Sequence, residues 1–228
     1  MRLFFAAILI FMFGEIKAQT YEVGLFAGGA NNIGDVGRTN FILPSGPAFG
    51  GLFKWNKSKR YAWRASVIYG EFTADDAKSD ISSRQRRNLI MDNSMLEVSA
   101  GLEFNFVEYN LHQLGPAFTP YLYTGFTYFR YGYHYFDAAQ LQDVGQKDGS
   151  FSIPMTVGAK LRLNQFLIVG AEIGARYTFT DNLDASNPEG SNYEDFRFGN
   201  IFSDDWYVFS GITLTYTFGR KPCQDCFQ

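Results

Sequence analysis

The stretch SMLEVSAGLEFNFV, Ser94–Val107, decides the fold of this chain. From Leu96 to Phe106 every second residue is apolar, whereas the residues between them include Glu97 and Glu103. Alternation with a period of two predicts a β-strand with one apolar face and one polar face. Strands of soluble sheets are usually about 5–6 residues long. A longer alternating strand is therefore typical of a barrel that crosses a membrane.

The same pattern recurs along the whole chain of 228 residues. It predicts eight strands, over Tyr21–Ala30, Gly46–Trp55, Arg60–Phe72, Ser94–Val107, Thr119–Tyr131, Ile153–Leu163, Leu167–Phe179 and Asp205–Phe218. The strand at Thr119–Tyr131 is aromatic on both faces, so its orientation stays open. No helix is needed, although the loop around Ser82–Met91 has room for one helical turn.

The connections between these strands alternate in length. Those at 56–59, 108–118 and 164–165 are short, whereas those at 31–45, 73–93, 132–152 and 180–204 are longer and polar. This predicts an all-β fold, an eight-stranded antiparallel transmembrane β-barrel with short periplasmic turns, long extracellular loops and periplasmic termini. The alternative is a soluble β-sandwich or lipocalin-like barrel, which would leave a wide apolar exterior uncovered.

The two ends of the chain complete the predicted organisation. Arg2 and the apolar run from Leu3 to Phe13 predict a secretory signal peptide over 1–18. The barrel then spans 19–218 and a short periplasmic tail spans 219–228. A net charge of −3 and a pI of about 5.4 give no sign of nucleic-acid binding. The predicted barrel is expected to be surrounded by outer-membrane lipids.

Aromatic residues lie near the predicted strand ends. Girdles of such residues mark the two interfaces of a membrane with water. The predicted interface residues are Tyr61, Trp63, Tyr177, Trp206, Tyr216 and Phe218.

Charged residues fall on the predicted inner face of the barrel. Eight strands enclose just enough space for their own side chains. The predicted lumen charges are Arg64, Glu97, Glu103, Lys160, Arg162, Glu172 and Arg176. Opposite charges would pair there and block the lumen, so a structural core is favoured over a small-solute channel. The carboxylates lack a serine–histidine partner, and we expect no enzyme activity, no cofactor and no metal site.

The tail carries the only two cysteines, in the segment GRKPCQDC that ends at Cys226. Cys223 and Cys226 allow a local disulfide in an oxidising compartment, a redox pair or a two-thiol metal site. The redox pair is weak because the motif lacks a thioredoxin-like context. The metal site is weak because structural zinc takes four ligands and the motif offers two thiols. The tail is otherwise a docking segment, in which Arg220 and Lys221 would contribute charge.

Two segments carry a family resemblance. YEVGLFAGGANNIGDVG at Tyr21–Gly37 and GITLTYTFGRKPCQDC at Gly211–Cys226 resemble the PorG-like outer-membrane proteins of the Bacteroidota type IX secretion system, which also serves gliding motility. The resemblance implies a scaffold that anchors a periplasmic ring made of a lipoprotein and its partner protein. It also implies that Cys223 and Cys226 face that ring. The alternative function is a general barrel of the OmpA/OmpX type for adhesion or envelope integrity.

Overall fold

The computed structural model describes residues 20–111, 115–200 and 202–219. It contains the strands β1 Thr20–Ile33, β2 Gly46–Asn56, β3 Tyr61–Asp75, β4 Ile90–Asn105, β5 Ala117–Asp137, β6 Gln140–Arg162, β7 Leu167–Thr178 and β8 Trp206–Phe218. Short helices lie in the loops, η1 Asp76–Lys78, α2 Ser82–Arg87 and η2 Ser191–Phe196. The predicted signal peptide and the tail beyond Gly219 lie outside the described residues.

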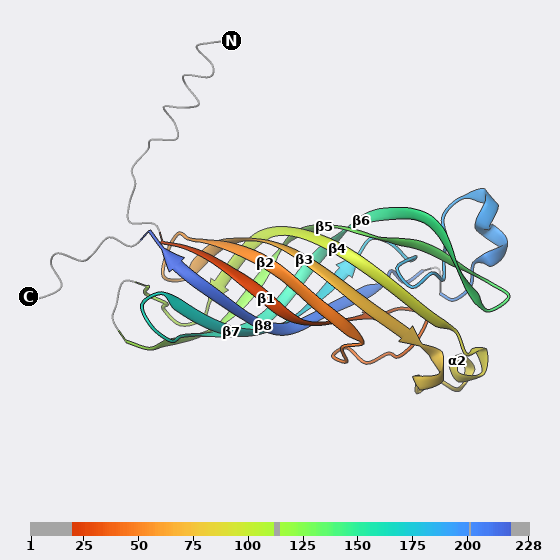
Figure 1. Cartoon of the computed structure of the whole chain (residues 1–228), viewed down its shortest axis with the longest axis horizontal. Helices are drawn as coiled ribbons and strands as arrows, with labels where there is room; N and C mark the ends of the chain where they lie inside the picture. The colour runs from red at the N-terminus through yellow and green to blue at the C-terminus, as the bar shows by residue number, and fades with distance from the viewer. Residues whose placement is uncertain (1–19, 112–114, 201, 220–228) are drawn as a thin grey trace, which may run out of the picture.

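The strands form a closed antiparallel barrel in chain order, β1 to β8 (Figure 1). The first and last strands close it, with Tyr21 opposite Phe218 and Ile33 opposite Trp206. Closure gives every strand a hydrogen-bonded neighbour on both sides within the ring. The predicted fold class, an eight-stranded antiparallel barrel, is therefore confirmed.

The two ends of the barrel differ in their connections. At one end, which we call the turn end, short segments join β2 to β3, β4 to β5 and β6 to β7. The first strand begins at this end, at Thr20, and the last strand finishes there, at Phe218. At the other end, the loop end, long segments carry η1, α2 and η2, as the right-hand side of Figure 1 shows. In the described residues, no helix is long and apolar enough to span a membrane.

Alternation along each strand separates an interior from an exterior. In β4 the residues Glu97, Ser99 and Glu103 are buried, while Val98 and Leu102 are exposed. The exterior wall is a belt of apolar side chains that includes Val23, Leu25, Phe49, Val67, Leu96, Val98, Leu122, Phe126, Val157, Ile212 and Leu214. An apolar band of this kind is what a barrel presents to lipid.

The orientation of β5 is settled by burial. Tyr121, Tyr123, Phe129 and Tyr131 point inward, whereas Phe118, Leu122, Phe126 and Tyr128 are exposed. The sequence left this open because rings occur on both faces. The inward rings meet charged groups, as the Arg64 guanidinium carbon lies 4.8 Å from the Tyr123 ring centroid.

One predicted loop is wrong. Residues 132–152 continue β5 and β6 as a paired hairpin that projects beyond the rest of the barrel. The hairpin reverses at Ala138 and Ala139, whose φ angles of 46° and 66° are left-handed. Turns of this kind normally contain Asn-Gly or Asp-Gly, and the absence of that signal hid the hairpin.

The aromatic residues predicted for the interfaces lie on the outer wall in two groups. At the turn end Phe218 stacks on Tyr21 with ring centroids 5.6 Å apart, and Tyr216 stacks on Phe166 at 5.8 Å. Tyr61 and Trp63 are exposed at the same end. Near the loop end Tyr177 and Trp206 lie edge to face, with centroids 5.2 Å apart. These groups bracket the apolar belt.

Candidate functional site: the lumen and the outer cap

The centre of the lumen is an ionic layer built on Glu103. Its two carboxylate oxygens contact the amines of Lys54 at 2.7 Å and of Lys160 at 2.6 Å. All three side chains are almost completely buried. β4, β2 and β6 supply one side chain each, so the contact crosses the barrel rather than following neighbouring strands.

Two further ion pairs extend this layer. Arg64 forms a bidentate pair with Glu172, with both N–O distances 2.7 Å, and the Tyr121 hydroxyl donates to the same carboxylate. Arg176 donates to Glu97 at 3.0 and 3.2 Å, and the Tyr207 hydroxyl donates to Glu97 at 2.8 Å. Each of the three lumen carboxylates Glu97, Glu103 and Glu172 is therefore paired with at least one cation.

Arg162 lies inward as predicted, but its partners differ from those expected. Its guanidinium donates to the carbonyl oxygens of Gly115 and Asn110 at 2.6 to 2.9 Å. The predicted pairing with a carboxylate across the lumen is therefore wrong for this residue. It sits near the turn end, where the β4–β5 connection brings backbone carbonyls within reach.

Two lumen charges were missed from the sequence. Lys54 is a partner of Glu103, and Glu22 accepts from Asn56 and Thr215, both at 2.9 Å. The signal was present, because Lys54 lies between the outward residues Phe53 and Trp55, and Glu22 precedes the outward Val23. Period-two alternation applied to these shorter strands would have placed both inward.

The half of the lumen towards the loop end is apolar. Phe129 and Tyr207 meet edge to face with centroids 5.2 Å apart, and Tyr207 and Phe209 do so at 5.5 Å. Phe72, Met91 and Met95 are fully buried in the same cluster. A layer of apolar and aromatic side chains thus lies between the ionic layer and the loops.

Above this layer the loops 34–45, 76–89 and 179–205 form what we call the outer cap. Asp76 ties two of them together: its carboxylate accepts from the backbone N–H of Gly37 at 2.8 Å and pairs with Arg87 at 2.7 Å. Asp184 accepts from the backbone N–H groups of Asp35 and Val36. Asp205 accepts from those of Leu183 and Asp184 at 2.9 and 3.3 Å.

Two of these cap carboxyls share a buried site. A side chain on Gly34 would collide with both the Asp184 and the Asp205 carboxylate, so the two converge beside this glycine. Burial raises the pKa of Asp205 well above its ordinary value, and the charge of Asp184 raises it further. Burial also raises the pKa of Asp184, and that of the neighbouring Asp181 to about 6. The cap therefore holds protons more tightly than isolated aspartates do.

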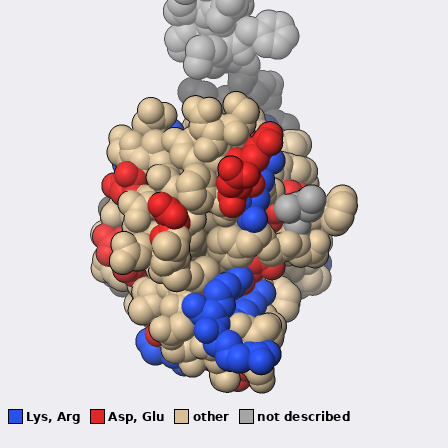
Figure 2. Space-filling model, turned by 90° about the vertical axis from the view of Figure 1, so that its right-hand side faces the viewer, with Lys and Arg blue, Asp and Glu red and all other residues tan. Residues whose placement is uncertain are grey.

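The surface of the loop end is divided by charge. Figure 2 shows Lys and Arg gathered towards the lower edge, on the side where Figure 1 places α2, and Asp and Glu gathered towards the upper edge and the left. Arg84, Arg86 and Arg87 belong to α2. Within the described residues, no group of three His, Cys, Asp or Glu side chains is arranged to hold a metal ion.

The predicted docking residues Arg220, Lys221, Cys223 and Cys226 lie outside the described residues. Phe218, from which that segment continues, lies at the turn end next to Tyr21. Their predicted disulfide or docking role stays a prediction.

A family model described as "Domain of unknown function (DUF6089)" matches residues 1–227. The chain belongs to this DUF6089 family. No curated protein matches it.

Solved outer-membrane barrels resemble this DUF6089 family member in shape. The attachment invasion locus protein Ail of Yersinia pestis, solved with the heparin analogue sucrose octasulfate, is 11% identical at a TM-score of 0.45, covering 88% of this chain and 97% of that chain. A major outer membrane protein of Thermus thermophilus is 15% identical at a TM-score of 0.45, covering 89% of this chain and 100% of the other. The N-terminal barrel of Pseudomonas aeruginosa OprF is 9% identical at 0.41, covering 89% and 98%. Similarity at this level says nothing about function.

Proposed function

We propose that this protein is a non-enzymatic, non-conducting barrel of the outer membrane that works by binding at its loop end, in adhesion or envelope integrity. The observation that carries the proposal is the contrast between the lumen, which is filled by ion pairs and aromatic side chains, and the cap, whose loops are joined by hydrogen bonds of buried carboxylates. The working surface is then the outside of the cap rather than a path through the barrel.

The apolar belt supports the membrane placement. Large apolar side chains face outward along all eight strands, among them Leu25, Phe126 and Ile212. Such a surface is unfavourable in water and favourable in lipid. Barrels of the outer membrane keep short turns in the periplasm and long loops outside, so the cap would face the surroundings of the cell.

The paired charges support the absence of transport and of catalysis. Glu97, Glu103 and Glu172 each accept from at least one cation and are almost completely buried. A carboxylate in such a pair is held by its partners and is out of reach of a substrate. Passage of a solute would require these pairs to separate inside a narrow barrel.

The test combines conductance with replacement of the cap. The purified chain should give no steady conductance in planar bilayers. In cells that lack the gene, a variant whose segment 181–203 is replaced by a short Gly-Ser linker should reach the outer membrane and fold, but should not restore adherence or detergent resistance. Conductance by the wild type, or full restoration by the loop-replaced variant, would contradict the proposal.

The second candidate is the anchoring of a periplasmic ring of the type IX secretion system, with gliding motility as a further output. Its support is the resemblance of the two end segments, together with the position of Thr20 and Phe218 at the turn end. A tail that continues from Phe218 would then emerge on the periplasmic side, where Arg220, Lys221, Cys223 and Cys226 would meet a ring lipoprotein or its partner.

Membranes carrying the wild type, Cys223→Ser or Cys226→Ser, run on reducing and non-reducing gels, test this candidate. A larger band that contains a ring protein, collapses on reduction and disappears in one variant would support a covalent tether. Tail-truncated protein that still retrieves the ring after gentle solubilisation would contradict a docking role for the tail.

A further inference from the structure

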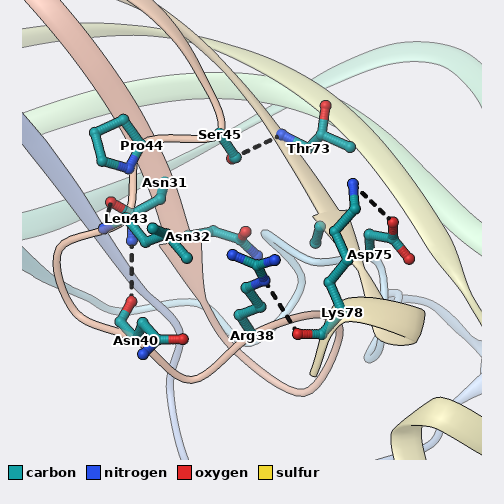
Figure 3. Close-up of a pocket in the computed structure, with 11 residues that line it drawn as sticks. Asn31, Asn32, Arg38, Asn40, Leu43, Pro44, Ser45, Thr73, Asp75 and Lys78 are labelled. Carbon is teal, nitrogen blue, oxygen red and sulfur yellow. Dashed lines mark hydrogen bonds and ion pairs between the residues drawn. The ribbon is translucent and has the colours of Figure 1, made fainter. Parts of the chain in front are cut away.

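A polar pocket of about 290 Å³ lies at the loop end, between the β1–β2 connection and the end of β3. Figure 3 shows Arg38 and Lys78 extending between two walls. One wall carries Asn31 and Asn32 of β1, and the other carries Thr73 and Asp75 of β3. The residues that line this pocket include neither the ion pairs of the lumen nor the cap carboxyls Asp184 and Asp205.

The wall of this pocket is made by a loop that folds back over the outside of the barrel. The Asn31 side chain holds it: its amide donates to the carbonyls of Asn40 and Phe41, and its oxygen accepts from the N–H of Leu43 at 3.4 Å. Pro44 packs against the outer face of β1 at Gly29, where a side chain would collide with the Pro44 ring. The loop wall of the pocket therefore lies on the outer flank of the barrel.

The donors of the pocket are only partly used. Arg38 donates through Nε to the Lys78 carbonyl at 3.1 Å, and among the described residues its two terminal nitrogens have no hydrogen-bond partner. The Lys78 amine pairs with Asp75 at 3.0 Å. Asn32 is 6% exposed, and its amide nitrogen has no partner in the described structure. The buried Asn32 amide is costly without a partner, whereas the Arg38 side chain is exposed to solvent; an anionic headgroup that bears hydroxyls would engage both.

Two arginines of the neighbouring loop are already occupied. Arg84 donates to the Gly37 carbonyl at 3.0 Å, and Arg87 pairs with Asp76. They hold the cap together, which leaves Arg38 as the arginine that lines the pocket.

The height of the pocket corresponds to a lipid headgroup. Tyr69 is an exposed aromatic residue of β3, and Thr73 lies on the same outward face four residues further. At about 3.3 Å per residue, this is roughly 13 Å along a tilted strand, and Asn32 on the opposite wall pairs with Tyr207, next to Trp206 of the aromatic group near the loop end. Next to the pocket, Phe41 and Ile42 are 61% and 57% exposed. Exposed apolar side chains on the flank of a membrane barrel fit acyl chains rather than water.

We propose that this rim pocket binds the phosphorylated sugar headgroup of a lipid in the outer leaflet. Arg38 would contact the phosphate, Asn32 and the nearby hydroxyls the sugar, and Phe41 and Ile42 the acyl chains. The volume approaches the lower end of small-ligand pockets, about 300 Å³, and exceeds what a bare phosphate needs. The proposal rests on the proposed placement in the outer membrane.

The test measures lipid binding to the full mature chain, refolded in nanodiscs of neutral phosphatidylcholine. The probes are a phosphorylated glucosamine lipid (lipid A), the same lipid without its phosphates, and inorganic phosphate. The variants are Arg38→Gln and Arg38→Glu, with Arg86→Gln as the matched control. Arg86 belongs to the neighbouring α2 and does not line the pocket, and its guanidinium Nε donates to the Ser82 carbonyl at 3.3 Å. Gel mobility without heating checks that each barrel is folded.

The wild type and Arg86→Gln should bind lipid A and prefer it to the dephosphorylated lipid. Arg38→Gln should bind about tenfold to a hundredfold more weakly, as expected for a charge-assisted hydrogen bond, and Arg38→Glu more weakly still. Equal binding by Arg38→Gln and Arg86→Gln, or by both lipids, would overturn the proposal. Inorganic phosphate binding as tightly as lipid A would overturn the lipid assignment.

This assay is independent of where the chain resides in the cell. A failure of the proposed function would be seen instead in cell fractionation or in the loop-replacement experiment. The two results can therefore be separated.

Discussion

At the scale of single residues, the lumen depends on cations and carboxylates that have no access to water. Glu103 holds Lys54 and Lys160 and lies 3.7 Å from Arg64. A buried ion pair adds little net stability compared with a well-packed apolar core, but the loss of one partner leaves the other charge stranded. Removal of one partner should therefore destabilise this layer more than the small net contribution of the intact pair suggests.

Glu103→Gln should lower the free energy of unfolding by about 3–5 kcal/mol, because two buried ammonium groups lose their counter-charge. Denaturant titration of the barrel in lipid vesicles measures this. Glu108→Gln is the control, since its pairs with Lys59 and Arg60 are long, at 3.6 and 3.7 Å, and solvent-exposed. A loss no larger than that of the control would show that the lysines discharge or rehydrate.

The residue scale also shows the limit of sequence reasoning. Alternation was sufficient to place Arg64, Glu97 and Glu172 inward, since facing is a local property of a strand. It could not reveal that Arg162 would bind the carbonyls of a turn, or that Asn31 would hold a folded-back loop. Those partners are brought together only by closure of the barrel.

At the scale of elements, strand ends were harder to predict than strands. The eight strands were found, but β3 runs to Asp75 and β6 begins at Gln140, well inside predicted loops. Beyond the apolar belt both faces of a strand meet water or other loops, so the alternation that reveals a strand disappears. The hairpin of β5 and β6 is held there by backbone pairing instead.

The stability of the β5–β6 hairpin should increase when the two residues at its tip are replaced. Ala138→Asn combined with Ala139→Gly replaces two left-handed alanines by residues that favour this conformation, which should stabilise the hairpin by about 1 kcal/mol. Hydrogen exchange of the amides in 132–147 measures the change. The converse variant Gly145→Ala, at a φ of +72°, should accelerate exchange in the same segment. Faster exchange in the Ala138→Asn, Ala139→Gly variant, or slower exchange in Gly145→Ala, would contradict this explanation.

The cap should respond to pH in the opposite sense to most acidic proteins. The pKa values of Asp184 and Asp205 are raised in the folded cap, mainly by burial, and that of Asp181 is about 6. A carboxyl with a raised pKa is protonated in the folded state before it is protonated in the unfolded state. Stability is therefore lost as the pH rises from about 4 through 6 and is regained on acidification.

Amide protection at Leu183 and Asp184 should consequently be higher at pH 5 than at pH 7.5. Asp205→Asn should remove most of this difference and raise protection at neutral pH, since a neutral amide can still accept from both N–H groups. Asp195→Asn, on exposed η2, is the control and should keep the wild-type pH dependence. A cap that loosens on acidification would contradict this assignment.

At the scale of the whole molecule, the apolar belt determines where the barrel can reside. Val98 lies midway along the wall, and Ile90 lies on the same strand and face near the loop end. They are almost equally exposed, at 51% and 53%. They differ in their distance from the aromatic groups that bracket the belt, and hence in their expected depth.

Val98→Arg should destabilise the barrel in lipid vesicles by about 2–4 kcal/mol, whereas Ile90→Arg should cost about 0–1 kcal/mol, because the penalty for a charge depends on its depth. Unfolding titrations of the two variants in the same vesicles give the comparison. Equal costs would place the bilayer elsewhere on the wall.

The pairing of β1 with β8 has a consequence for biogenesis. Tyr21 meets Phe218, residues almost two hundred positions apart in the chain, and every strand between them is a link in the ring. Contacts between such distant residues form slowly. The chain must be complete before its ends can join, and until then both end strands present unpaired edges. The unclosed barrel therefore carries an aggregation hazard that the closed ring has lost, and covering those two edges before closure would remove it.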